Sequence, residues 1–329
     1  MNQAQAIEQM NQYGAAKIPF LFIIDFEGTT AYIKKLSEVN PQEVLYDIRG
    51  TRNTSGNHGR LAKQVIFQKK PQPFAQYRQG FEQVLEHINF GNSYLLNFSA
   101  LTPIDTNLTL HEVFTHSKAT YKLWFRDEWV VFSPEIFVQI EEGKIASYPM
   151  KGTIDAAIPD AENMILADPK ETAEHNTIVD LIRNDLSTVA KNVRVERFRY
   201  IDALHTLDKT LLQVSSKIVG ELPLDYASKI GELMFTLLPA GSISGAPKKK
   251  TVEVIKAAED YQRGFYTGVM GIFDGQNLDS GVMIRFIERI NHQLYFKSGG
   301  GITTFSQAEA EYQELIDKVY VPIIRDHSV

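Results

Sequence analysis

The sequence predicts an α+β fold made of antiparallel strands rather than a doubly wound parallel sheet. Its apolar strand patterns come in pairs joined by short turns such as Glu142-Gly143, Asp274-Gly275 and Asn291-His292, which are typical of β-hairpins. They do not alternate regularly with helices, as parallel units would require. With 329 residues, 43% of them hydrophobic and 22% charged, the chain can build one large domain or two ordinary ones.

The N-terminal part contains short strands and one amphipathic helix. Residues 18–24 and 43–47 are apolar strand patterns, and residues 49–72 are rich in Gly, Asn, Arg and Lys, which predicts a mobile loop. Residues 73–91 begin with Pro, end with Gly and carry apolar residues at helical spacing, which predicts a helix. A strand over residues 93–100 follows.

The remaining elements are hairpins followed by helices at two places. Residues 128–133 and 136–150 alternate as strands, and residues 161–190 predict one long amphipathic helix or two joined ones. Further on, the sequence predicts a meander of three strands, over residues 264–273, 281–290 and 293–299. A last helix is predicted over residues 307–325.

Composition excludes several classes of function. The net charge of -6 and the pI of about 5.8 argue against a nucleic-acid-binding surface, and the dense basic run 248–250 is typical of a solvated helix start. The absence of cysteine excludes disulfides, thiolate metal sites and cysteine nucleophiles. The apolar run 18–24 is too short to span a membrane, and no signal sequence precedes it. We therefore expect a soluble cytoplasmic protein.

Two pairs of glutamates are spaced so that each pair shares one helix face. Glu171 and Glu174 are three residues apart, as are Glu311 and Glu314. Oxygen ligands of this kind suit Mg²⁺, which accepts one or two carboxylates and leaves positions for water and an anionic substrate. Solvated helix charge is the alternative. The second pair follows the glycine-rich strand exit 297–304, which would let backbone approach a ligand closely.

A second glycine-rich stretch and a buried arginine indicate binding of an anion. Residues 237–250 match neither a dinucleotide fingerprint nor a P-loop, but their backbone N–H groups could hold a carboxylate or a phosphate; a tight turn before a helix is the alternative. Arg285 interrupts the apolar pattern of residues 281–290. Its planar fork matches a carboxylate, either of a ligand or of another side chain of the protein.

Lys151 and Glu135 lie at the ends of predicted strands. Lys151 follows an apolar strand and precedes a glycine, so its amine either extends to water or is directed at a ligand. Glu135 follows Pro134 among apolar neighbours, where a carboxyl group can acquire a raised pKa and act as a general acid. An exposed residue at a bend is the alternative for Glu135.

Taken together and in order, these blocks resemble the chorismate-utilising enzymes, most closely their aminodeoxychorismate synthase component I branch. The blocks are SPE, PMKGT, AEH followed by IVDLIRND, PAGSISGAPK, RGFYTGVMG, MIR, and GGGIT followed by EAEYQE. They cover about residues 73–325, and so many matching blocks in one order make the resemblance specific.

The resemblance implies two large antiparallel sheets packed as a sandwich, with the site between them and helices outside. It implies a short N-terminal β segment with the mobile loop over residues 1–72, packed on the core, and a chorismate-binding catalytic domain over residues 73–329. Glu174 and Glu314 would ligate Mg²⁺, and Glu171 and Glu311 would act directly or through water. The metal would hold the ring carboxylate of chorismate.

The resemblance also places the substrate. Arg285 and Tyr266 match positions that hold the enolpyruvyl carboxylate. The other positions matched to substrate binding are Thr153, Gly241, Ser242, Ile243, Ser244, Gly245, Ala246, Gly300 and Gly301.

The resemblance also implies a role for Lys151. In the branch of this family that aminates chorismate, the matching position is a lysine. In that branch the amine attacks ring C2 and expels the C4 hydroxyl, and ammonia then attacks C4 and expels the lysine. Glu135 matches the acid that protonates the departing hydroxyl. Because a glutaminase of the common type needs a cysteine and this chain has none, a separate glutamine amidotransferase subunit is expected to supply the ammonia.

Two positions depart from the family's pattern. Leu95 stands where Gln is usual, or Lys as the water-activating base of isochorismate synthases, and this favours amination. Gln213 replaces a histidine and cannot titrate. Anthranilate synthase, isochorismate synthase and a non-catalytic relative that binds a dicarboxylate or a partner protein are the alternatives.

Overall fold

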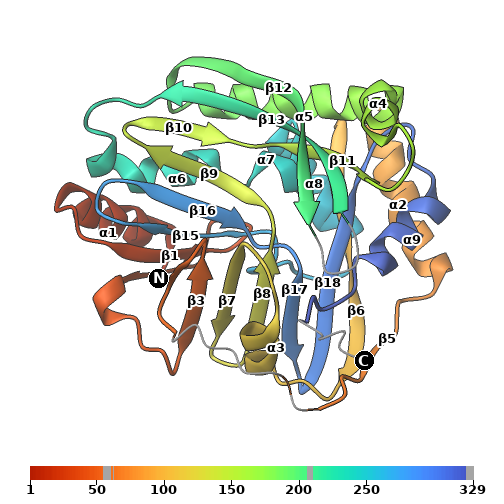
Figure 1. Ribbon diagram of the computed structural model, residues 1–329, viewed down its shortest axis with the longest axis horizontal. Coiled ribbons are helices and arrows are strands. Elements are labelled where there is room, and N and C mark those ends of the chain that lie inside the picture. The colour runs from red at the N-terminus through yellow and green to blue at the C-terminus, as the bar shows by residue number, and fades with distance from the viewer. Residues whose placement is uncertain (55–60, 62, 206–209, 324–329) are drawn as a thin grey trace.

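The computed structural model describes residues 1–54, 61, 63–205 and 210–323, and these residues form two antiparallel sheets with helices on their outer faces (Figure 1). Most strands of the first sheet run across the view, and those of the second run down it, with β6 extending into the upper half. The predicted α+β fold with two large antiparallel sheets is therefore confirmed.

The first sheet has the strand order β11-β13-β10-β9-β16-β15-β1-β2, and β12 also pairs with β13. Its strands are β1 Phe20–Ile24, β2 Ala31–Lys35, β9 Ile136–Glu141, β10 Lys144–Ser147, β11 Met150–Asp155, β12 Lys191–His205, β13 Thr210–Glu221, β15 Val269–Phe273 and β16 Leu278–Val282.

The second sheet has the strand order β14-β6-β18-β17-β8-β7-β3-β4, and β5 also pairs with β6. Its strands are β3 Val44–Ile48, β4 Thr51–Arg52, β5 Phe67–Lys69, β6 Leu95–Thr106, β7 Tyr121–Phe125, β8 Trp129–Ser133, β14 Gly245–Ala246, β17 Phe286–Ile290 and β18 Gln293–Ile302.

Helices cover the outer faces of both sheets. They are α1 Gln3–Ala15, α2 Phe74–Asn89, α3 Leu110–His116, α4 Ala161–Ala167, α5 Pro169–Ser187, α6 Ile230–Leu237, α7 Gly241–Ser244, α8 Lys248–Ala258 and α9 Ala308–Asp317, with short 3-10 turns at Leu36–Glu38 and Tyr226–Lys229. Helices α1, α5 and α6 lie on the first sheet, while α2, α8 and α9 lie against β6 and β18.

Side-chain alternation along the strands separates the inner core from the outer layers. On β1, Leu21 and Ile23 pack between the sheets, whereas Phe20, Phe22 and Ile24 pack toward the helices. Strands β7 and β8 alternate in the same way, with one set of side chains between the sheets and the other under α3. Because both faces of these strands are buried, their sequences are nearly continuous apolar runs.

The predicted helix over residues 161–190 is two helices, because the sequence starts a new one at Asp168. The Asp168 side chain accepts a hydrogen bond of 2.9 Å from the Glu171 backbone N–H, and Pro169 occupies the first helical position. This capping fixes the start of α5, and with it the position of the first glutamate pair.

The predicted single strand over residues 281–290 is wrong, because the chain changes sheet within it. Strand β16 belongs to the first sheet and β17 to the second, and Arg285 lies between them with φ of +56°. The chain also crosses from β8 to β9 at Pro134 and Glu135. The two crossovers lie side by side, since Val282 N donates to Glu135 O (3.0 Å) and Phe132 N donates to Arg285 O (3.1 Å).

Other sequence predictions differ in extent. The last helix ends at Asp317, and the strand predicted over residues 93–100 continues to Thr106. Parts of the loop predicted over residues 49–72 lie outside the described residues, and strands β4 and β5 lie within that range. The division at residue 73 stays a prediction.

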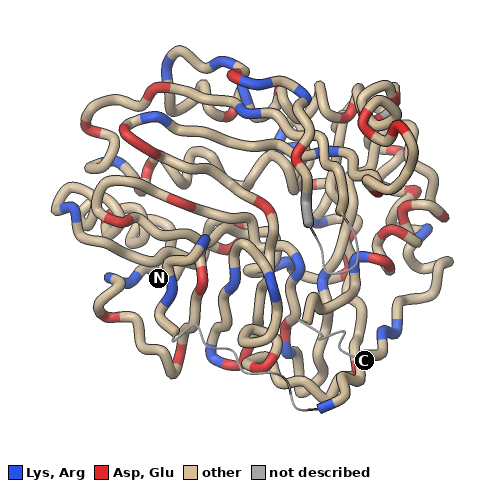
Figure 2. Tube along the Cα trace, viewed as in Figure 1, with Lys and Arg blue, Asp and Glu red and all other residues tan. Residues whose placement is uncertain are grey.

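Charge and hydropathy along the chain are unremarkable for a globular fold. Acidic and basic residues are interspersed along most of the trace (Figure 2). Among the described residues, no helix has the length and apolar content needed to cross a membrane.

Candidate active site

A cavity of about 300 Å³ lies beside the two crossovers, with walls from both sheets and from helices α5 and α9. This volume is within the range of small-molecule sites. Most residues predicted from the sequence line it, namely Glu135, Lys151, Thr153, Gly241, Ser242, Ile243, Tyr266, Arg285, Gly300, Gly301 and Glu314.

Lys151 lies within β11, and its amine is directed into the cavity. The pairing of β11 with β13 is interrupted between Met150 and Thr153, and Gly152 has φ of +79° at this bulge. Lys151 Nζ lies 3.5 Å from Glu174 Oε2, and the lysine side chain is 25% exposed. A Cβ atom at position 301 would lie 3.3 Å from that nitrogen, so a glycine there leaves room for the amine. The side chain therefore does not extend away to solvent.

Glu135 presents its carboxyl group to the cavity from the crossover between β8 and β9. The hydroxyl of Ser242 donates a hydrogen bond to Glu135 Oε1. Burial raises the pKa of this carboxyl group above its usual value, although the Ser242 bond and the charges of Lys151, Lys318 and Arg285 act in the opposite direction. A carboxyl group in this environment can hold a proton and give it to a leaving group.

Arg285 and Tyr266 reach the cavity from neighbouring bends in the chain. The Arg285 guanidinium lies 5.5 Å from the ring centroid of Tyr320. Within the part of the chain that the structure describes, no carboxylate lies within ion-pair distance of Arg285. Tyr266 is 3% exposed. A ligand carboxylate would fit the planar fork of Arg285.

The segment after α6, which contains the short helix α7 and strand β14 and is called the 241–246 loop below, both lines the cavity and pairs with the second sheet. Residues 241–243 line the cavity. Ser244 Oγ donates to Ala240 O at 2.8 Å, and Gly245 and Ala246 pair with β6 as strand β14. Ser244, Gly245 and Ala246 therefore hold the loop in place from behind the cavity-lining residues.

Gly245→Ala is expected to destabilise the protein by about 2 kcal/mol or more, because the added Cβ atom would overlap backbone. Gly245 has φ of +120°, and its Cβ would lie 1.8 Å from Leu95 O. Gly143→Ala is the matched control, since Gly143 has φ of +76° with open space around it. Thermal unfolding followed by circular dichroism measures both. An equal decrease in thermal stability for Gly245→Ala and Gly143→Ala would contradict the close approach of the Leu95 backbone to Gly245.

The two glutamate pairs approach the cavity from α5 and α9. A Cβ atom at Gly152 would lie 3.1 Å from Glu171 Oε2, and one at Gly300 would lie 3.2 Å from Glu311 Oε2. Each pair also has a lysine beside it, at 3.5 Å between Lys151 and Glu174 on one wall and 2.6 Å between Lys318 and Glu314 on the other. Of the four predicted metal ligands, Glu314 lines the cavity, whereas Glu171, Glu174 and Glu311 lie beside the cavity-lining residues Gly152, Lys151 and Gly300.

The chemistry of these donors fits Mg²⁺. The described residues contain no group of three or more Asp, Glu, His or Cys side chains already gathered at metal-binding spacing. Mg²⁺ does not require one, because one or two protein carboxylates suffice when water and substrate oxygens complete its octahedron. Glu174 on α5 and Glu314 on α9 stay the predicted ligands, and each lies beside a lysine, Lys151 and Lys318 respectively.

The sequence analysis missed three charged residues that line the cavity, Lys318, Asp185 and Lys297, and also Lys248, which does not line it but pairs with Asp185. Lys318 follows Glu314 by four residues, a helical spacing that could have revealed it, and its Nζ also donates to Gly299 O at 2.9 Å. Asp185 and Lys248 form a largely buried ion pair at 2.8 Å. Burial raises the pKa of Asp185 and lowers that of Lys248. The expectation of a solvated basic run is therefore wrong for Lys248.

The two departures from the family's pattern are both at the site. Leu95 is buried on β6, and its Cδ1 would lie 3.2 Å from a Cβ atom at Gly301. Gln213 lines the cavity on β13, where it pairs in register with Thr153. Neither side chain can act as a base at neutral pH.

Comparisons with known proteins agree with this geometry. Residues 16–323 match the family described as chorismate binding enzyme. An uncharacterized PabA-like protein of Haemophilus influenzae is 50% identical over 317 residues, which are 96% of each chain. Aminodeoxychorismate synthase component 1 of Escherichia coli is 31% identical over 261 residues, 74% of this chain and 56% of the relative.

A solved structure has the same fold. The menaquinone-specific isochorismate synthase of Escherichia coli superposes with a TM-score of 0.70 at 15% identity, covering 96% of this chain and 80% of that one. With the family match extending across both sheets and the cavity between them, the chain belongs to the chorismate-binding enzymes.

Proposed function

We propose that this protein is an aminodeoxychorismate synthase component I. It would convert chorismate and ammonia to 4-amino-4-deoxychorismate, which leads to para-aminobenzoate and folate. The observation that carries the proposal is the Lys151 amine, which is held inside the cavity that also contains the Glu135 carboxyl group. The similarity to the Escherichia coli synthase component supports the same conclusion.

Residues of the crossovers and the loops would bind the substrate. Arg285 and Tyr266 hold the enolpyruvyl carboxylate, and the bare backbone at Gly300 and Gly301 lets the ring approach the sheet. Thr153 adds a hydroxyl group to the same wall. The start of the 241–246 loop, at Gly241 and Ser242, would contribute backbone N–H groups.

Lys151 and Glu135 would carry out two successive displacements. In the first, the Lys151 amine, having lost its ammonium proton to solvent, bonds to ring C2, both ring double bonds shift, and the C4–O bond breaks so that the hydroxyl leaves as water. In the second, ammonia bonds to C4, both double bonds shift back, and the C2–N bond to Lys151 breaks. In each displacement Glu135 gives one proton to the departing group and regains one from the nitrogen that has just bonded.

Mg²⁺ would be held by Glu174 and Glu314, with Glu171 and Glu311 acting directly or through water. Bound there, the ion would neutralise the ring carboxylate of chorismate. Helix α5, whose start is fixed by its cap, would carry Glu171 and Glu174 toward the site from one side. Helix α9 would carry Glu311 and Glu314 toward it from another.

Leu95 favours amination over the isochorismate reaction. Isochorismate formation needs a base that activates water, and Leu95 places a buried apolar side chain at that position. Identification of the product by chromatography and mass spectrometry, with chorismate, Mg²⁺ and ammonium salt, is the deciding experiment. Anthranilate or isochorismate as the product would identify the corresponding enzyme of the family, and no turnover would identify a non-catalytic relative.

The purified chain is expected to use ammonium salts but not glutamine as its nitrogen source. A glutaminase of the common type forms a thioester on cysteine, and this chain contains none. Product formation should rise with pH as the fraction of free NH₃ increases. Adding a glutamine amidotransferase subunit should restore the use of glutamine. Glutamine-dependent activity of the single purified chain would contradict the need for a partner.

A further inference from the structure

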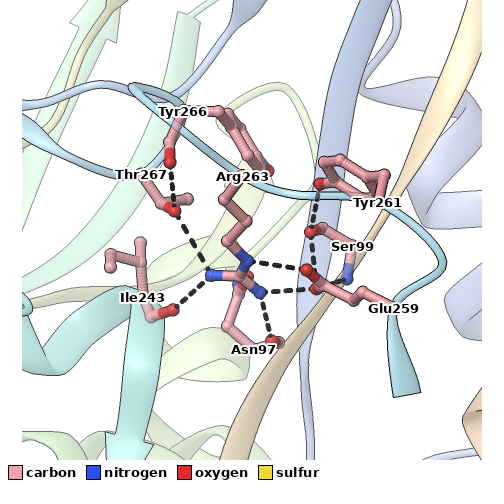
Figure 3. A network of polar contacts seen from close by, with 8 residues as sticks. All are labelled: Asn97, Ser99, Ile243, Glu259, Tyr261, Arg263, Tyr266 and Thr267. Atoms are coloured by element: carbon pink, nitrogen blue, oxygen red, sulfur yellow. Dashed lines mark hydrogen bonds and ion pairs between the residues drawn. The ribbon is translucent and has the colours of Figure 1, made fainter. Parts of the chain in front are cut away.

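A buried ion pair lies directly behind the cavity wall. Arg263 and Glu259 are joined at 2.6 Å, with side chains only 2% and 1% exposed (Figure 3). The pair is further enclosed by Ser99, whose backbone N–H and hydroxyl donate to Glu259 Oε1 at 2.8 and 2.7 Å. Neither charge lines the cavity, so the pair is separate from the residues proposed to contact chorismate.

Every N–H group of the Arg263 guanidinium has an acceptor. Nε donates to Glu259 Oε2 at 2.9 Å. Nη1 donates to Ile243 O at 3.1 Å and to Thr267 Oγ1 at 3.3 Å. Nη2 donates to Glu259 Oε1 at 2.6 Å and to Asn97 O at 2.7 Å. The five donors of an arginine are thus fully used, and three of them leave the ion pair to reach other segments.

Those three acceptors belong to three separate parts of the cavity wall. Ile243 lies in the loop after α6 and Asn97 lies on β6, and both line the cavity. Thr267 follows Tyr266, which also lines it, and the Thr267 hydroxyl donates to the Tyr266 carbonyl at 2.5 Å. Figure 3 shows the guanidinium between these groups. One side chain therefore connects segments that meet only in the folded protein.

The bend at Thr267 needs such support. Thr267 has φ of +62°, a left-handed conformation that β-branched residues rarely adopt. A strained backbone of this kind persists only where surrounding contacts fix it. Its contacts include Arg263 Nη1 and the bond from its own N–H to Met283 O at 2.8 Å, which joins the bend to the crossover that carries Arg285.

We propose that Arg263 is a positioning residue of the chorismate site: it fixes the Ile243 loop, β6 at Asn97 and the Tyr266 bend relative to one another, without touching the substrate. This inference rests on the proposed use of the 241–246 loop and Tyr266 in substrate binding. The role requires a planar fork with donors in several directions, which a lysine ammonium does not provide.

Arg263→Lys separates positioning from structural support. The lysine keeps a positive charge beside Glu259, so the buried carboxylate stays compensated, but it cannot reach Glu259, Ile243, Thr267 and Asn97 together. We expect the Kd for chorismate, measured by calorimetry with Mg²⁺ present in a Lys151→Ala background in which no adduct can form, to rise about tenfold or more, because hydrogen bonds that set the site are lost. The kcat of the variant should fall by a smaller factor than its affinity for chorismate.

Thr267→Val gives a second, milder test that leaves the ion pair intact. It keeps the β-branched shape and removes only the hydroxyl that links Arg263 to the Tyr266 bend. We expect the Kd for chorismate to rise about fivefold, with a thermal midpoint that falls by less than that of Arg263→Lys because the ion pair stays intact. If Arg263→Lys does not fold, this variant alone decides the question.

Lys122→Met is the matched control for removing a buried cation. Lys122 is buried on β7 and donates to the carbonyls of Phe114 and Ser117, on the outer face of the second sheet. The Lys122→Met variant should have a lower thermal midpoint but an unchanged Kd for chorismate. An unchanged Kd in both Arg263→Lys and Thr267→Val would overturn the positioning role. Because the readout is chorismate binding and not product identity, this outcome is distinguishable from failure of the proposed amination.

Discussion

Lys151→Ala is expected to slow formation of aminodeoxychorismate by at least about 10³-fold, because the covalent route to C4 is lost with its nucleophile. The Lys151 amine lies in the cavity beside Glu174, and no cysteine is present to replace it. The fold should persist, since the side chain is partly exposed to the cavity rather than packed in the core.

The covalent intermediate itself can be trapped. Chorismate and Mg²⁺ without ammonia should leave an adduct of chorismate minus water on the protein, because no nitrogen nucleophile arrives to expel Lys151. Rapid quenching, intact mass spectrometry and peptide mapping measure it. Lys217→Ala is the control, since Lys217 lies on β13, pairs with Glu196 and does not line the cavity. An adduct on another residue, or undiminished amination by Lys151→Ala, would return Lys151 to a non-catalytic role.

The second large effect is expected at the proposed metal ligands. Glu174→Gln and Glu314→Gln should each reduce Mg²⁺-dependent turnover by at least about 100-fold, because an amide is a much weaker ligand for a hard cation than a carboxylate. Titration of Mg²⁺ against chorismate consumption measures the change, and circular dichroism checks the fold. Higher Mg²⁺ should recover part of the activity if ligation alone is impaired.

Glu309→Gln is the control for the metal prediction. Glu309 lies on the same helix as Glu314, but it is exposed and does not line the cavity. It should leave the Mg²⁺ dependence unchanged. Turnover by Glu174→Gln or Glu314→Gln near that of the unmodified protein, with Mg²⁺ present, would show that the ligands are assigned wrongly.

Local sequence patterns predicted much of the fold and the cavity. The hairpin turn at Glu142-Gly143 is present, with φ of +50° and +76° at its two residues. The helix over residues 73–91 is α2. These features follow from side-chain periodicity and turn chemistry, which act between close neighbours in the chain. Residues on several such elements, Lys151 and Arg285 among them, then meet at one cavity.

The sheet crossover and the buried charges could not be predicted in the same way. Residues 281–290 have a strand pattern that Arg285 interrupts, and nothing in that pattern shows that the chain changes sheet at Arg285. Lys248 stands in a basic run that is typical of an exposed helix start, yet it is buried against Asp185. The partner that makes such burial tolerable comes from a different helix.

By itself, the sequence determined the chemical inventory of this protein: an amine at Lys151, carboxylates in pairs on two helices, glycines where the backbone approaches the cavity, and no thiol. Only the tertiary structure decided which of these groups face one another, and it added Lys318 and the Arg263–Glu259 pair. The physical reason is that these contacts join residues far apart along the chain. Arg263 and Asn97 are 166 residues apart in the chain, and a hydrogen bond between them is specified by the packing of two sheets and not by any local pattern.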